Sequence, residues 1–217
     1  GRPVDSSFGY TYSYDARRTG LNPNAGVLFQ LSQDFGGVGG NRTFIKTTAK
    51  AVAQTLVWNE EVTLRATLEG GAIDFTRGKS RVSDRFSIGP SIMRGFEYGG
   101  IGPREIGPGG VNDSLGGQFY AVAKFEAEFP LGLPEEYGIS GGVFYDIGAV
   151  WDPGDTSALA SPGHRIVSAD FEDRHVLGFS IFWDSVLGPL RMDFSEAVKK
   201  SKYDEALNFN LGISTKF

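Results

Sequence analysis

The chain has 217 residues, a formal net charge of −5, 31 glycines, 17 phenylalanines, two methionines and no cysteine. The absence of cysteine excludes a disulfide framework and a thiolate metal site, and the modest negative charge without a basic stripe argues against nucleic-acid binding. The sequence has no run of about eighteen apolar residues, so no transmembrane helix is predicted. A membrane-spanning strand needs only about ten residues with every second one apolar, so a membrane protein stays possible.

Nine segments alternate apolar and polar residues with a period of two, which predicts strands. Residues 1–5 precede this pattern and are expected to be a linker or a remnant of cloning. In chain order the strand segments begin at Phe8, Val27, Ile45, Val62, Phe119, Val143, Leu177, Leu190 and Leu207. We therefore expect residues 6–217 to form one all-β unit.

The connections between these segments are short at one end and long at the other. The short connections are Arg17–Asn24, Val57–Asn59, Pro130–Tyr137 and Ser185–Gly188. They are rich in Pro, Gly and Asn, as tight turns are. Thr76–Gly116 and Asp152–Asp173, at the other end, are long. This asymmetry is typical of an antiparallel up-and-down transmembrane β-barrel in an outer membrane.

A soluble β-sandwich also alternates apolar and polar residues, but three features weigh against it. The predicted strands are longer than the five or six residues that are roughly typical. Aromatic residues gather toward strand ends, as interface girdles do. Charged residues stand near strand centres on the polar face, as a wet lumen would allow: Lys50, Arg65, Lys124, Glu126, Asp146 and Arg191.

An odd number of strands is unusual, because single-chain bacterial barrels use even numbers so that the first and last strands pair. Two open edges in lipid would leave backbone groups unpaired at several kcal/mol each. We therefore expect the nine strands to be part of a larger barrel. A miscounted strand, or edges completed by another chain, are the alternatives.

The long connection Thr76–Gly116 is expected to have no secondary structure of its own. Such a loop is uncommon in a compact domain and is usually functional or disordered. Its apolar residues argue against disorder: Phe86, Ile88, Ile92, Met93, Phe96 and Tyr98. We expect it to fold back onto the protein and to deliver Arg94, of the step Arg94-Gly95-Phe96, to a specific place.

Four motifs then occur in one order: MRGFEYGGIGPR, YDIGAVWD, WDSVLGPLRMDFSEAVKK and FNLGISTKF. Together they resemble the C-terminal part of the barrel of the BamA family of outer-membrane protein assembly factors. The resemblance covers residues 6–217 and would account for the last nine strands of a barrel of about sixteen. A terminal Phe alone is a weak signal, since many outer-membrane proteins share it.

The resemblance implies a loop-to-wall latch made of Arg94, Gly95, Phe96, Glu126 and Asp146. In the family the long loop, here residues 76–116, folds into the lumen, where its Arg meets carboxylates of the inner wall. Strand parity agrees, because both acids lie opposite the apolar face. One guanidinium can fork onto two carboxylates. The alternative is a solvated arginine in a mobile loop.

The resemblance also implies a weak lateral seam next to the last strand, where an incoming strand would be added by β-augmentation. The residues of this seam strand are Phe209, Leu211, Gly212, Ile213 and Phe217. Gly212 would weaken the ladder and ease a kink there. Plain relief of curvature in a barrel wall is an equally good explanation of this glycine.

The implied function is non-enzymatic insertion and folding of β-barrel proteins in the bacterial outer membrane. Its implied partners are membrane lipids and lipopolysaccharide, nascent outer-membrane proteins, and accessory lipoproteins docked on periplasmic domains outside this chain. No cofactor is expected. The alternatives are a translocator of the TamA or two-partner-secretion kind, a passive porin and a barrel hydrolase.

Motifs for catalysis are missing from the sequence. There is no GxSxG or HExxH, and neither histidine, His164 nor His175, has a carboxylate at metal-ligand spacing. Glu126 and Glu128 could act as an acid–base pair, but we expect them to be charge partners of Lys124 and Arg94. No catalytic residue and no metal site is therefore predicted.

Overall fold

A computed structural model describes residues 7–16, 25–37, 43–59, 61–78, 80–156, 163–185 and 188–213. Residues 1–5, the predicted linker, lie outside this part. The described strands of the main sheet are β1 (Ser7–Asp15), β2 (Gly26–Gly36), β3 (Thr43–Val57), β4 (Val62–Arg77), β7 (Phe119–Pro130), β8 (Ile139–Trp151), β10 (Arg174–Ser185), β11 (Gly188–Lys199) and β12 (Phe209–Ile213). All nine predicted strands are confirmed.

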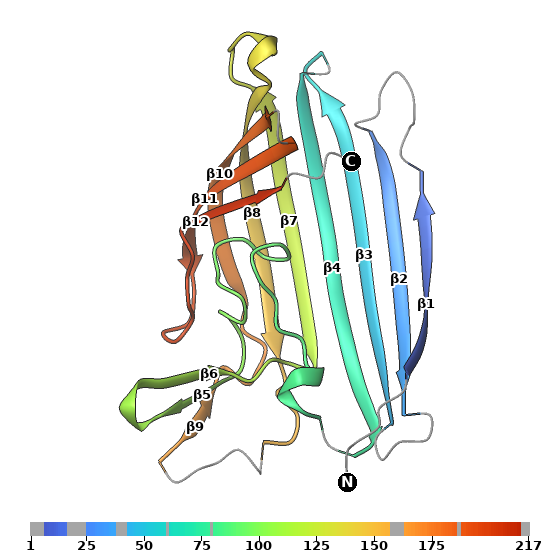
Figure 1. The fold of residues 1–217 in the computed structure, drawn as a ribbon, viewed down its shortest axis with the longest axis vertical. Helices are drawn as coiled ribbons and strands as arrows, with labels where there is room; N and C mark the ends of the chain where they lie inside the picture. Colours follow the sequence, from blue (N-terminus) through green and yellow to red (C-terminus); the bar gives the residue numbers. More distant parts are fainter. Residues whose placement is uncertain are drawn as a thin grey trace.

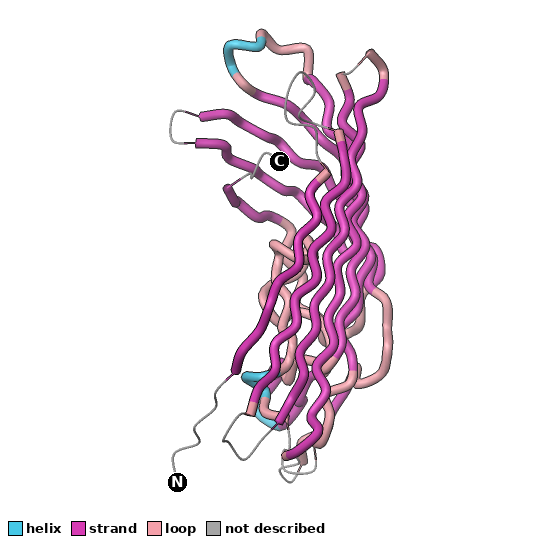
Figure 2. Tube along the Cα trace, turned by 90° about the vertical axis from the view of Figure 1, so that its right-hand side faces the viewer, coloured by secondary structure: helices cyan, strands magenta, loops and turns pink. Residues whose placement is uncertain are grey.

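The nine strands pair antiparallel in the order β1-β2-β3-β4-β7-β8-β10-β11-β12, which confirms the up-and-down topology. The sheet curls, so that β10, β11 and β12 lie over the same face of the sheet as connection 78–118 (Figures 1 and 2). No helix in the described part of the chain is long and apolar enough to cross a membrane.

Alternate residues of each strand face opposite sides, as the period of two requires. Phe125, Val143 and Leu177 are exposed on the convex side, whereas Asp146 and Val176 are fully buried on the concave side. The polar and charged positions that the sequence placed opposite the apolar face therefore lie on the concave side. This face is the inner wall of the fold.

The long connections contain secondary structure that the sequence did not predict. They contain three short strands, β5 (Arg104–Gly107), β6 (Val111–Ser114) and β9 (Arg165–Val167). These strands form a second sheet in the order β6-β5-β9. The same connections contain the 3₁₀ turns η1 (Val82–Asp84) and η2 (Pro108–Gly110), and a third turn, η3 (Glu135–Tyr137), lies between β7 and β8. The expectation that Thr76–Gly116 has no secondary structure of its own is wrong. Strands of three or four residues are too short to show periodicity, and β9 joins β5 from a different loop.

The core of the protein lies between connection 78–118 and the inner wall. The loop contributes Phe86, Ile88, Met93, Phe96 and Ile101; the strands contribute Ile73, Tyr120, Val122, Phe144, Val150, Val176 and Ala197. The loop is therefore held inside the curve of the sheet by apolar burial. Tyr98, grouped with these residues in the sequence, is instead 76% exposed.

Candidate functional site

Arg94 is carried into the interior by a tight turn of the loop. The backbone N–H groups of Ile92 and Met93 both donate to the carbonyl of Gly89, at 3.0 Å. Gly95 then adopts φ +82°, in the left-handed region that side chains rarely enter. A Cβ on Gly95 would lie 2.6 Å from Cγ1 of Val176, so both the backbone and the wall demand glycine here.

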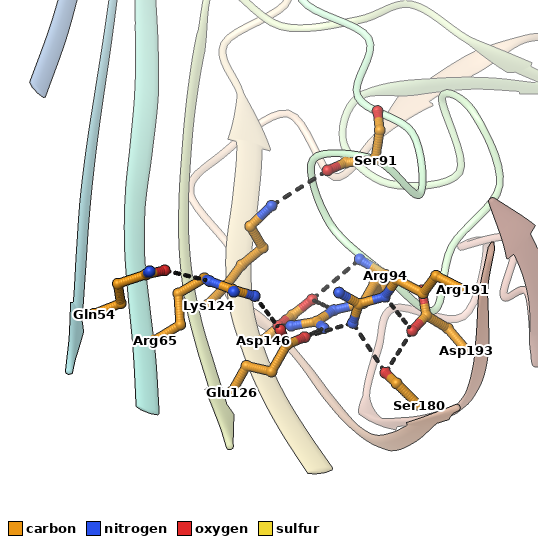
Figure 3. A network of polar contacts seen from close by, with 10 residues as sticks. All are labelled: Gln54, Arg65, Ser91, Arg94, Lys124, Glu126, Asp146, Ser180, Arg191 and Asp193. Carbon is orange, nitrogen blue, oxygen red and sulfur yellow. Dashed lines mark hydrogen bonds and ion pairs between the residues drawn. The ribbon is translucent and has the colours of Figure 1, made fainter. Parts of the chain in front are cut away.

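The Arg94 guanidinium forks onto two buried carboxylates of the wall (Figure 3). Its Nε donates to Oδ2 of Asp146 at 2.7 Å and its Nη2 to Oδ1 of Asp146 at 2.5 Å, while Nη1 pairs with Glu126. The backbone N–H of Arg94 also donates to Asp146, at 3.2 Å. The structure thus brings the predicted arginine and both predicted acids together.

Glu126 is shared by two further arginines of the wall. Arg65 Nη1 donates to Oε1 of Glu126 at 2.7 Å, and Arg191 Nη2 donates to Oε2 at 2.5 Å. Arg191 also bonds Asp193 through Nε at 2.7 Å and Ser180 through Nη2 at 2.9 Å. Three arginines therefore face three carboxylates, which balances the charge of these six groups; the carboxylates are buried, while the side chains of Arg65 and Arg191 stay 17% and 20% exposed.

Aromatic rings of the wall lie next to two of these guanidinium groups. Arg94 Cζ lies 3.7 Å from the ring centre of Phe144, and Arg191 Cζ lies 4.8 Å from that of Phe182. Burial by itself would lower the pKa of Arg94, but the hydrogen bond and charge of Asp146, followed by the charge of Glu126, outweigh it and raise that pKa. A planar, permanently charged group suits this site better than an ammonium.

The sequence did not identify the whole network. A sequence signal could have identified Arg65, because Arg65 is the cross-strand partner of Glu126 in the β4–β7 register and opposite charges pair there. No such signal could have identified Arg191, because β11 reaches β7 only through the curl of the sheet. The expected pairing of Lys124 with the glutamates gives way to a 3.2 Å hydrogen bond to the carbonyl of Ser91. Glu128 accepts from Ser140 at 2.9 Å.

The two histidines lie apart from this network. His164 Nδ1 is 2.8 Å from Oε1 of Glu105, and His175 contacts Asp173 and the hydroxyl of Tyr145. Among the described residues no group of three or more His, Asp or Glu side chains could hold a metal ion.

Strand β12, the predicted seam strand, forms the described edge of the sheet beyond β11. Phe209, Leu211 and Ile213 point outward and are exposed, while Gly212 faces Arg191 in the register. Phe217 lies outside the described residues. A Cβ on Gly212 would meet only one atom, Nδ2 of Asn210 at 3.9 Å, so packing does not demand glycine at this position.

Gly212→Ala separates the two explanations of this glycine. We expect the free energy of unfolding to stay within about 1 kcal/mol of the wild-type value, because there is room for the methyl group. A strand that must kink for the function expected from the sequence would lose that function at this unchanged stability. Urea titration together with an assay of that expected function measures both quantities; unchanged function would favour simple relief of curvature.

Comparison with known proteins places the chain in a family. The Omp85 superfamily domain matches residues 1–217. The chain belongs to the Omp85 superfamily. It is 27% identical over 218 residues to the outer membrane protein assembly factor BamA of Neorickettsia risticii, covering 100% of this chain and 28% of that protein. It is 27% identical over 169 residues to BamA of Neisseria meningitidis, covering 68% and 21%.

An animal protein is also similar to this Omp85 chain. The sorting and assembly machinery component 50 homolog of Xenopus tropicalis is 32% identical over 135 residues, which cover 60% of this chain and 27% of that protein. The crystal structure of Haemophilus ducreyi BamA lacking POTRA domains 1–3 superposes with a TM-score of 0.76 at 21% identity, covering 95% of this chain and 41% of that one. The predicted likeness to the barrel of BamA is confirmed. The chain spans just over a quarter of the length of the first relative.

Proposed function

We propose that the full-length protein containing this chain inserts and folds β-barrel proteins in the bacterial outer membrane. The observation that carries the proposal is the Omp85 match along all 217 residues, together with relatives named as BamA assembly factors. This chain would supply the C-terminal strands of the barrel and the loop that fills its interior.

The proposed mechanism uses main-chain hydrogen bonding and no covalent step. In the described residues β12 pairs with β11 along one edge, so its other edge can receive a strand of a nascent outer-membrane protein. The latch would brace the inner wall at β8 and β7, which are three and four strands away from β12, and Arg191 would extend that brace to β11. The wall would then stay rigid while the seam opens.

The proposed partners follow from the surfaces of the barrel. Lipids, including lipopolysaccharide, would cover the apolar convex face, where Phe125, Val143, Leu177 and Phe179 are exposed. Accessory lipoproteins would dock on periplasmic domains outside this chain. The function needs no cofactor and no catalytic residue, because client strands exchange hydrogen bonds only.

Depletion of the full-length protein tests this function directly. Assembly of unrelated outer-membrane barrels should fail, and purified protein in lipid vesicles should accelerate the folding of an unfolded barrel, as measured by the heat-modifiable gel shift. An unrelated porin in the same vesicles is the control. If client barrels assemble normally after depletion, the proposal is wrong; secretion of one substrate, or lipid hydrolysis, would instead favour a translocator or a hydrolase.

A further inference from the structure

The segment Asp204–Leu207, which we call the clamp segment, leads directly into the seam strand. It lies in the connection between β11 and β12, beside connection 78–118 (Figure 1). Contacts with the rest of the protein involve each of its four residues. The contacts used below come from two sources, the main chain of the Arg-Gly-Phe loop and two buried arginines outside the latch. Ser195 of β11 also donates a hydrogen bond to the carbonyl of Leu207, at 2.9 Å.

The main chain of the loop pairs with the clamp segment like a short antiparallel ladder. The N–H of Leu207 donates to the carbonyl of Gly95 at 3.0 Å, and the N–H of Glu205 donates to the carbonyl of Gly100 at 2.9 Å. Glu97 N–H donates in return to the carbonyl of Glu205, at 3.0 Å. Phe96 forms an antiparallel bridge with Ala206.

Two arginines fasten the acidic half of the clamp segment. Arg174, at the start of β10, places Nε 2.9 Å and Nη2 3.2 Å from the carboxylate oxygens of Asp204, and both side chains are fully buried. Arg104, at the start of β5, places Nη2 2.8 Å from Oε1 of Glu205. Asn112 joins this second pair, accepting from Arg104 at 2.6 Å and donating to Glu205 at 3.2 Å.

These contacts link the latch to the seam strand through a few consecutive residues. The side chain of Arg94 donates hydrogen bonds to Asp146. The next residue, Gly95, accepts a hydrogen bond at its carbonyl from the N–H of Leu207. Leu207 precedes the first residue of β12 by two positions. Phe96, between them, is 2% exposed and sits in the core, so the loop cannot slide along the clamp segment without unpacking.

We propose that the clamp segment couples the latch to the seam strand, with Arg104 and Arg174 as positioning residues that hold the start of β12 on the Arg-Gly-Phe loop. Release of Arg94 from the wall then loosens β12, and release of the clamp loosens the loop. The meaning of this coupling for lateral opening rests on the proposed function. The coupling itself is a property of the folded protein.

Hydrogen–deuterium exchange on the full-length protein, without any client, tests the coupling in both directions. Arg94→Lys keeps the charge but loses the fork, and should speed exchange in residues 204–213 by about tenfold or more, although the hydrogen bonds and ion pairs of the Arg94 side chain go to Asp146 and Glu126. Asp204→Asn should speed exchange in residues 95–100 by a similar factor. Residues 43–77 of β3 and β4 serve as an internal reference.

Lys199→Gln is the matched control, because it removes an ion pair with Asp173 at the same end of β11 but outside the clamp. It should leave both regions unchanged. If Asp204→Asn also speeds exchange in β3 and β4, Glu205→Gln replaces it, since that variant leaves the main-chain ladder intact. Unchanged exchange in 204–213 for Arg94→Lys and in 95–100 for the clamp variant overturns the coupling.

The outcomes separate the coupling from the proposed function. Coupled exchange in a protein that fails to assemble client barrels overturns the proposed function alone. Uncoupled exchange in a protein that assembles them normally overturns the coupling alone.

Discussion

Arg94→Ala is expected to destabilise the folded barrel by about 3–5 kcal/mol, the usual cost of removing one partner from a buried ion pair. Most of this lost stability comes from Asp146, which is fully buried and accepts hydrogen bonds from two nitrogens of the Arg94 guanidinium. Glu126 suffers less, because Arg65 and Arg191 still bond both of its oxygens. The loop should also leave the wall, and the proposed assembly of client barrels by the full-length protein should fall with it.

Urea unfolding of the full-length protein, followed by the heat-modifiable gel shift, measures this loss. Lys124→Gln is the control, because Lys124 lies on the same inner face of β7 and contacts the same loop, but only through one hydrogen bond to the Ser91 carbonyl. It should cost about 1 kcal/mol or less. Equal stability and assembly in Arg94→Ala and the wild type would rule out the latch.

Gly95→Ala is expected to cost about 2–5 kcal/mol although it leaves every charged group in place. A left-handed φ of +82° costs a side chain about 1–2 kcal/mol. The added methyl group would also lie 2.6 Å and 2.8 Å from the two Cγ atoms of Val176, and overpacking of this kind adds about 1–3 kcal/mol. Arg94 would be pushed out of register with Asp146, so assembly should fall as it does for Arg94→Ala.

A double substitution separates the two costs of Gly95→Ala. Val176→Ala removes both Cγ atoms that the added methyl group would meet. The Gly95→Ala/Val176→Ala protein should therefore lose less free energy of unfolding than the two single variants lose in sum, a favourable coupling in a double-mutant cycle. Gly109→Ala, in the same loop, is the matched control: φ is +75° there, and nothing lies within 4 Å of an added Cβ. It should show only the backbone cost. Equal losses at positions 95 and 109 would contradict a tight fit against the wall.

The glycines and arginines of the loop thus act together. Gly95 lets the chain pass Val176 closely, and that approach brings the backbone N–H of Arg94 and its guanidinium onto the same carboxylate of Asp146. Phe144 beneath the guanidinium excludes water from one face. The ion network and the apolar core of the loop therefore stabilise the same position of Arg94.

Much of the wall could be predicted because strand structure is local in sequence. Strict alternation places residues such as Phe125 and Glu126 on opposite faces whatever the neighbouring strands do. This parity, with short and long connections alternating, was enough to predict nine strands and an inner face. The family likeness then singled out Arg94, Glu126 and Asp146, and the structure places all three in contact.

The amino-acid sequence by itself therefore determined the strands and the direction in which their side chains face, and its likeness to a family pointed to the residues of the predicted latch. The tertiary structure decided which distant groups meet. Arg191 reaches Glu126 across the curl of the sheet, β9 pairs with β5 from another loop, and Arg104 and Arg174 converge on the clamp segment. A period of two records the direction of a side chain, but curvature and loop packing set its partner, and these depend on the whole chain at once.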